Sequence, residues 1–251
     1  KPYMAATLNN LANQYYYTQR FGESEAMYKE ALEIRRRLAA ANPQAYEPDV
    51  AVTLNNLAIL YMNTQRFEDS EAMYQEALEI YRCLAATNPQ SYEPDVAVTL
   101  HNLALLYSNT QRFTESEAMY TEALEIHRRL AVANPQAYEP DVAMTLNNLA
   151  NLYSNTQRFE ESETMLKEAL GIRRRLAITN PQAYEPDIAT TLNNLALLYS
   201  NTRRFTESET KYNETLEIYR RLAADNPQAY EPYVALLLNN LAILYSQTQR
   251  F

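Results

Sequence analysis

The sequence has very little cysteine and glycine and no tryptophan. Its 251 residues include one cysteine, Cys83, so no disulfide forms within the chain and the fold does not depend on an oxidising compartment. With only two glycines, Gly22 and Gly171, it has no glycine-rich phosphate-binding loop. No apolar run reaches the roughly 18 residues that suggest a membrane-spanning helix. These absences argue against a disulfide scaffold, a nucleotide-binding loop and a transmembrane protein.

Basic residues are outnumbered by acidic ones. The 22 Lys and Arg against 31 Asp and Glu give a formal net charge of −9. Nucleic acids and anionic membranes select basic surfaces, so we expect neither as a partner. No signal peptide is recognisable, and a cytoplasmic location is favoured. Because the chain begins at Lys1 and not at Met, we expect a fragment of a longer protein.

The chain repeats itself every 46 residues. The hexamer TLNNLA at residues 53–58 recurs with small changes from residues 7, 99, 145, 191 and 237. A second motif, NPQxYEP, recurs from residues 42, 88, 134, 180 and 226. The intervals predict units of about 2–47, 48–93, 94–139, 140–185 and 186–231, with a partial unit at 232–251. A repeat array of this kind counts as one domain whatever its length.

Each unit predicts two helices. In the second unit, one apolar stripe with helical spacing is formed by Leu54, Leu57, Ala58 and Tyr61. A second stripe runs from Ser70 to Leu84, with acidic residues at its start and Arg82 near its end, which complements the helix dipole. We predict that NPQxYEP is the loop between units and that Pro48 lies in the first turn of the next helix.

These residues resemble the tetratricopeptide repeat family. The positions that match its signature are Leu54, Leu57, Ala58, Tyr61, Ser70, Tyr74 and Ala77. The resemblance covers essentially the whole chain and is nearest to the long-unit branch seen in kinesin light chains and many bacterial proteins. It implies an all-α, right-handed α-α superhelical solenoid with five full helix hairpins and one extra first helix. One departure is Gln65 and its counterparts, at the turn where the family often has glycine.

The resemblance also implies that the third face of each first helix lines a concave groove. Past its first turn this face has amide, hydroxyl and apolar residues but no charge. Neighbouring pairs are Asn9/Asn10, Asn55/Asn56, His101/Asn102, Asn147/Asn148, Asn193/Asn194 and Asn239/Asn240; further amides are Asn63, Asn109, Asn155 and Asn201. Carboxamides can hydrogen-bond a peptide main chain of any sequence. We expect an extended peptide or a partner helix to bind here, without the Lys and Arg of a carboxylate clamp.

Two alternatives remain for these side chains. One asparagine of each pair could instead bond the neighbouring repeat and hold the array in register, and the first member of each pair is the better candidate for that role. Tyr16 and Tyr17 add two rings near the first unit's groove. They are either partner anchors or neutral variation.

The sequence gives no indication of catalysis, of a cofactor or of a metal site. No nucleophile is paired with a base, and His101 and His127 stand alone in their units, where we expect them on the surface. The rival functions are a self-assembling structural array, with end-to-end association through an uncapped last helix, and the sensor arm of a larger regulator. Light scattering over a concentration series would test self-assembly.

Overall fold

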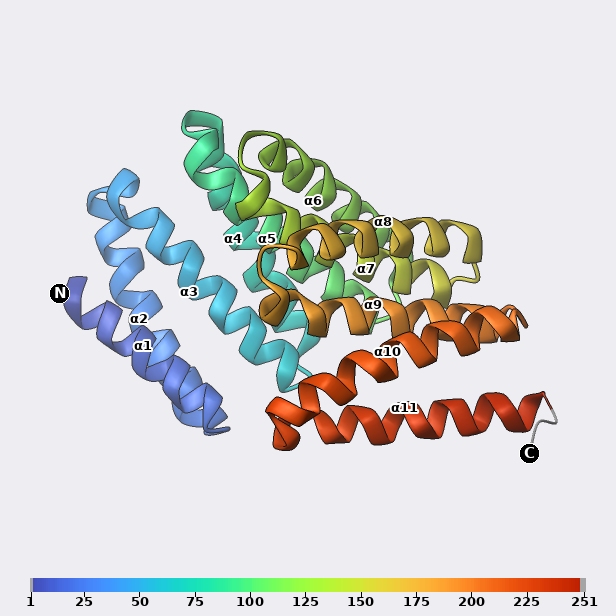
Figure 1. Ribbon diagram of the computed structural model, residues 1–251. Helices are drawn as coiled ribbons and strands as arrows, with labels where there is room; N and C mark the ends of the chain where they lie inside the picture. Colours follow the sequence, from blue (N-terminus) through green and yellow to red (C-terminus); the bar gives the residue numbers. More distant parts are fainter. Residues whose placement is uncertain (1, 249–251) are drawn as a thin grey trace. The chain divides into compact units, whose positions relative to one another are not determined.

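The structure is a computed structural model that describes residues 2–248 (Figure 1). Within this range it contains eleven α-helices and no strand. The helices are α1 (Pro2–Tyr17), α2 (Phe21–Ala41), α3 (Pro43–Asn63), α4 (Phe67–Thr87), α5 (Pro89–Asn109), α6 (Phe113–Ala133), α7 (Pro135–Asn155), α8 (Phe159–Ala177), α9 (Pro181–Asn201), α10 (Phe205–Asp225) and α11 (Pro227–Gln247). The last residues of the partial sixth unit, 249–251, lie outside the described residues.

The fold is an all-α array of helix hairpins, which confirms the predicted fold class and the 46-residue period. Helix contacts join neighbours in the chain, such as α3 with α4 and α9 with α10. The contacts divide the chain into two compact units, Lys1–Ile126 and His127–Phe251, and the boundary falls within α6. The single continuous domain that the repeats suggest stays a prediction, and the two units are described separately below.

The NPQxYEP segments begin helices and do not form the predicted loops. Asn42 is the N-cap of α3, and its Oδ1 accepts a hydrogen bond from the Ala45 amide at 3.3 Å. Pro43 follows at the first helical position, where its missing N–H is not needed. Pro48 therefore lies inside α3, not in its first turn. A single residue separates α2 from α3, and α3 and the later first helices α5, α7, α9 and α11 each begin five residues before Pro48 or its equivalent.

The turn within each hairpin uses a left-handed residue that is not glycine. Gln65 has φ of 60°, and its counterparts Gln19, Gln111, Gln157 and Arg203 have φ of 60–62°. The next residue, Arg66, bonds through its amide to the Tyr61 carbonyl at 2.8 Å. Its guanidinium lies 4.1 Å from the centroid of the Tyr61 ring. The repeated arginine–tyrosine contact covers a backbone conformation for which glycine is the usual residue.

Within a hairpin, small residues allow the two helices to pack closely. Ala58 and Ser70 are fully buried, and the Ser70 hydroxyl donates to the Ala58 carbonyl at 2.8 Å. In the compact unit His127–Phe251, the core includes Leu192, Leu195 and Tyr199 of α9 together with Tyr212 and Leu216 of α10. The helical stripes predicted from apolar spacing are thus the buried faces of the hairpins.

His101 and His127 are both buried, which contradicts the expectation that they lie on the surface. His127 is 1% exposed, and its Nδ1 lies 3.2 Å from Thr145 Oγ1. Burial lowers the pKa of His127 to about 4. The equivalent residues Arg35 and Arg173 are also buried; each donates to a threonine hydroxyl and a backbone carbonyl of the following helix. This position, which we call the junction position, joins α2, α6 and α8 to the next repeat through these side chains.

Candidate partner-binding face

Each first helix exposes one uncharged stripe, which we call the amide face. It has four positions at helical spacing, occupied in α3 by Val52, Asn56, Ile59 and Asn63. The equivalent sets are Ala6, Asn10, Asn13 and Tyr17 in α1; Val98, Asn102, Leu105 and Asn109 in α5; Met144, Asn148, Asn151 and Asn155 in α7; Thr190, Asn194, Leu197 and Asn201 in α9; and Leu236, Asn240, Ile243 and Gln247 in α11. All of them are exposed or half-buried.

The first members of the asparagine pairs mostly point toward neighbouring repeats. Asn9, His101 and Asn147 are buried, at 6%, 7% and 6% exposure. Asn55 is half-buried, and its Nδ2 donates to Thr99 Oγ1 of the next repeat at 2.9 Å. Successive residues of a helix are rotated by about 100° around its axis. The first member of a pair therefore faces away from solvent when the second member faces it. We therefore remove Asn9, His101 and Asn147 from the expected partner contacts.

The two remaining first members differ in exposure. Asn193 is half-buried, and Asn239 of α11 is exposed. The Oδ1 atoms of Asn55 and Asn193 are buried and, among the described residues, have no hydrogen-bond partner. Asn55 and Asn193 therefore turn their carboxamide oxygens into the protein, whereas Asn239 is exposed.

The second members lie on the amide face but also bond the preceding repeat. Asn56 Nδ2 donates to Asn9 Oδ1 at 3.5 Å, and Asn194 Nδ2 donates to Asn147 Oδ1 at 3.2 Å. A carboxamide has two N–H donors and a carbonyl acceptor, so one such bond leaves further capacity. Asn56 and Asn194 thus contact the preceding repeat and remain half-exposed to solvent. The sequence left these two roles as alternatives, and the geometry allows both.

Tyr16 and Tyr17 occupy different environments at the end of α1. Tyr17 is 82% exposed, whereas Tyr16 is half-buried and its hydroxyl accepts a hydrogen bond from Asn63 Nδ2. The two rings meet edge to face with centroids 5.6 Å apart. Tyr16 therefore belongs to the contacts between repeats, and Tyr17 is the ring that stays available on the amide face.

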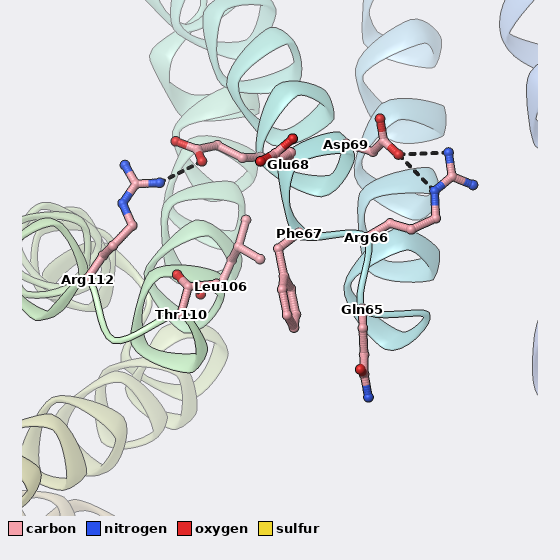
Figure 2. Close-up of a pocket in the computed structure, with 9 residues that line it drawn as sticks. Gln65, Arg66, Phe67, Glu68, Asp69, Leu106, Thr110 and Arg112 are labelled. Atoms are coloured by element: carbon pink, nitrogen blue, oxygen red, sulfur yellow. Dashed lines mark hydrogen bonds and ion pairs between the residues drawn. The ribbon is translucent and has the colours of Figure 1, made fainter.

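Charged residues gather elsewhere, at the hairpin turns. A cleft of about 520 Å³ lies near the turn between α3 and α4. In Figure 2, Arg66 pairs with Asp69 there, and Arg112 approaches from the next turn. Arg112 pairs with Glu71 at 2.6 Å. A similar cleft recurs in the second unit, where the hydrogen bond from Arg204 lowers the pKa of Glu163 to about 2. The recurrence of these ion pairs between turns indicates a role in joining repeats.

The described residues contain neither a candidate metal site nor a candidate membrane-spanning helix. Between residues 2 and 248, no three His, Cys, Asp or Glu side chains are grouped so as to hold a metal ion. None of the described helices combines the length and apolar character needed to cross a bilayer.

Repeated helix hairpins, in which each helix contacts its neighbours in the chain, define the protein as an α-solenoid. Within that class, the chain belongs to the tetratricopeptide repeat family. Two family models, both described as tetratricopeptide repeat, match residues 95–175 and residues 4–43, 50–82 and 188–228. Members of this family are in general scaffolds for protein–protein interaction and are typically not enzymes.

Solved structures support the same fold. BtubC (BKLC) from P. vanneervenii superposes with a TM-score of 0.72 at 24% identity, covering 92% of this chain and 85% of that one. Nearly identical repeats from a Podosopora anserina protein named for kinesin light chain give 0.68 at 15% identity, covering 90% and 98%. PilF of Pseudomonas aeruginosa gives 0.58 at 15% identity, covering 98% and 96%. Comparison with curated protein sequences gives no match.

Proposed function

We propose that the chain is a scaffold whose amide face binds an extended segment of another protein. The observation that supports this most is the chemistry of the face. Past Asp49 and its equivalents, no first helix has a Lys, Arg, Asp or Glu, although the chain as a whole is 21% charged. Charge is thus concentrated on the second helices and turns, and the exposed first-helix stripe remains neutral.

The pattern of the amide face suits a peptide main chain. Along α3 and α5, apolar side chains such as Val52 and Val98, at 41% and 45% exposure, alternate with asparagines. Packed helices lie about 8–10 Å apart, and an extended peptide rises about 3.3 Å per residue. One repeat therefore spans about three residues of a guest. Asparagines at the second and fourth positions would bond its amides and carbonyls, and the apolar positions would contact its side chains.

The test uses the double variant Asn56→Ala/Asn148→Ala, which has one change in each of the two compact units. Peptides that bind the 251-residue chain are first selected from a displayed random library. Their affinities for the unchanged chain and for the double variant are then measured by calorimetry. We expect at least a tenfold loss of affinity, because two bonds of about 1 kcal/mol each are removed. Asn213→Ala, an exposed amide of α10, is the matched control. Affinity should also change little with salt, because the face is uncharged.

Two results would contradict the proposal. Equal affinity of the double variant and the control, with unchanged helix content by circular dichroism, would exclude the amide face. A steep loss of affinity with salt would assign binding to the acidic second helices.

The rival function is self-assembly. Leu238 of α11 is 45% exposed, whereas its equivalents in α3, α5, α7 and α9 are fully buried and Leu8 in α1 is half-buried; the four buried residues are Leu54, Leu100, Leu146 and Leu192. An exposed leucine at a packing position favours contact with another apolar surface. End-to-end association therefore stays a prediction, which light scattering over a concentration series would test. The third alternative is that the array is the sensor arm of a larger regulator.

A further inference from the structure

The amide face contains a pocket in the compact unit His127–Phe251. It has a volume of about 320 Å³ and lies among α7, α8 and α9. Its inner wall includes Ser162 and Leu166, each 1% exposed, and its outer walls include Asn151, Asn155, Asn194 and Leu197. No charged side chain lines it. The pocket is therefore neutral, with apolar and hydrogen-bonding groups together.

Ser162 departs from a hydrogen bond that the other hairpins repeat. The hydroxyls of Ser24, Ser70, Ser116 and Ser208 each donate to an alanine carbonyl of the partner helix at 2.8 Å. The buried hydroxyl of Ser162 has no partner within the described chain. A buried hydroxyl without a hydrogen bond is unfavourable by about 1–3 kcal/mol. Because this hydroxyl lines the pocket, a guest with a polar atom could satisfy it.

Leu166 makes the fourth repeat different at the same place. The other four second helices have a buried tyrosine here, namely Tyr28, Tyr74, Tyr120 and Tyr212. In the first hairpin the Tyr28 hydroxyl donates to Asn13 Oδ1. Asn151 is the equivalent of Asn13, and it remains when the tyrosine is replaced by leucine. The fourth repeat thus keeps the amide that receives a phenol in the first repeat but lacks the phenol.

We infer that this pocket binds the phenol side chain of a tyrosine in the partner's extended segment. This inference rests on the proposed function, since the segment lies along the amide face. The guest ring contacts Leu166 and Leu197, and its hydroxyl donates to Asn151 Oδ1 and accepts from Ser162 Oγ. A phenylalanine leaves both polar groups without a partner, and a charged side chain loses its hydration without an opposite charge. Tyrosine is therefore favoured over either.

The test compares two probes that differ by one hydroxyl. N-acetyltyrosinamide and N-acetylphenylalaninamide are titrated into the 251-residue chain, and the methyl signals of Leu166 and Leu197 are followed by NMR. We expect the tyrosine probe to bind at least about fivefold more tightly, which corresponds to one net hydrogen bond. Equal affinities, or no shift at either methyl group, would overturn the inference.

Variants connect the preference to the pocket. Leu166→Tyr restores the side chain of the other repeats and should fill the pocket, abolishing the fivefold preference. Thr164→Tyr adds the same side chain at an exposed position of α8 and should leave the preference intact. If Leu166→Tyr does not fold, Asn151→Leu serves instead, because leucine stands at the equivalent positions Leu105 and Leu197. An undiminished preference in Asn151→Leu would overturn the inference.

Peptide selection separates this inference from the proposed function. Selected peptides that depend on Asn56 and Asn148, contain tyrosine and weaken at least fivefold with Leu166→Tyr support both. Selected peptides that show no tyrosine preference and bind Leu166→Tyr normally overturn the pocket and leave the proposed function standing. Binding of the tyrosine probe without any peptide binding supports the chemistry of the pocket and overturns the proposed function.

Discussion

The first and fourth hairpins have the same helix–turn–helix arrangement. They differ in the environment of one asparagine: Asn13 accepts a hydrogen bond from a tyrosine, whereas the equivalent Asn151 has a leucine at that tyrosine's position. In α1 and α2, Asn13 accepts a hydrogen bond from Tyr28, and Ser24 is bonded to the Ala12 carbonyl. In α7 and α8, Leu166 replaces the tyrosine and Ser162 has no partner among the described residues. The replacement of a tyrosine by Leu166 thus accompanies a pocket, while the positive φ at the turn is retained, at 60° for Gln19 and 62° for Gln157.

The difference shows how a repeat array can acquire specificity. Residues that define the hairpin, such as Ala58 and Ser70, recur at each interval because close helix packing depends on them. On the amide face the second position is asparagine in every repeat, whereas the first and third positions vary between repeats, because their neighbours include solvent. The comparison therefore predicts that variants at packing positions change stability, whereas variants around Leu166 change recognition. The following predictions test the stability side, from the largest expected effect to the smallest.

The largest effect is expected at the junction position of the third repeat. Because burial lowers the pKa of His127 to about 4, the folded chain keeps it neutral while the unfolded chain takes up a proton below about pH 6.5. Its contribution to stability is therefore lost as pH falls from 6.5 toward 4. We expect the free energy of unfolding to decrease by about 2 kcal/mol between pH 7 and pH 5 from this group.

Urea unfolding of the chain and of His127→Tyr at both pH values measures this effect. Tyrosine is the residue at the equivalent positions Tyr81 and Tyr219, and it does not titrate in this range. Acidic groups and His101 are common to both proteins, so their effects cancel in the difference. An identical pH dependence of the two proteins would show that His127 is accessible to protons in the folded state.

Much of the fold was predictable from the sequence, because its signals are local and repeated. The stripe of Leu54, Leu57 and Tyr61 has helical spacing, and the 46-residue interval defines the hairpin period. The loop prediction for NPQxYEP is wrong because α3 begins at Pro43, five residues before Pro48. The order Asn42-Pro43 is itself a signal of an N-cap followed by proline at the first helical position.

The site was less predictable because it depends on contacts between repeats. An uncharged first-helix stripe could be identified from the sequence. Which asparagine of a pair is buried depends on the next repeat, as with Asn55 and Thr99. His127 was misjudged for the same reason, since its partner Thr145 is on another helix. The pocket had one sequence signal, Leu166 in place of a repeated tyrosine, but its open volume required coordinates.

An intermediate effect of opposite sign is expected for two equivalent tyrosines. Tyr28→Phe removes the hydrogen bond to Asn13 and should lower the free energy of unfolding by about 1 kcal/mol. Tyr74→Phe should instead raise it by about 1 kcal/mol, because the Tyr74 hydroxyl is fully buried and has no partner within residues 2–248. Urea unfolding midpoints of the two variants measure both changes, and a loss of stability in Tyr74→Phe would contradict the second.

The smallest effect is expected at the hairpin turns, where the first and fourth hairpins are alike. Gln19 and Gln157 both have positive φ, at 60° and 62°, which costs a residue with a Cβ about 1–2 kcal/mol. Glycine removes that strain but loses about 0.5–1 kcal/mol through the greater freedom of the unfolded chain. Gln19→Gly and Gln157→Gly should therefore each stabilise by about 0.5 kcal/mol. Equal shifts in urea midpoint would show that the two hairpins have the same backbone energetics, so that their difference lies in the side chains around Leu166. Unequal shifts would mean that the fourth hairpin also differs in its turn, and the pocket could then not be attributed to one substitution.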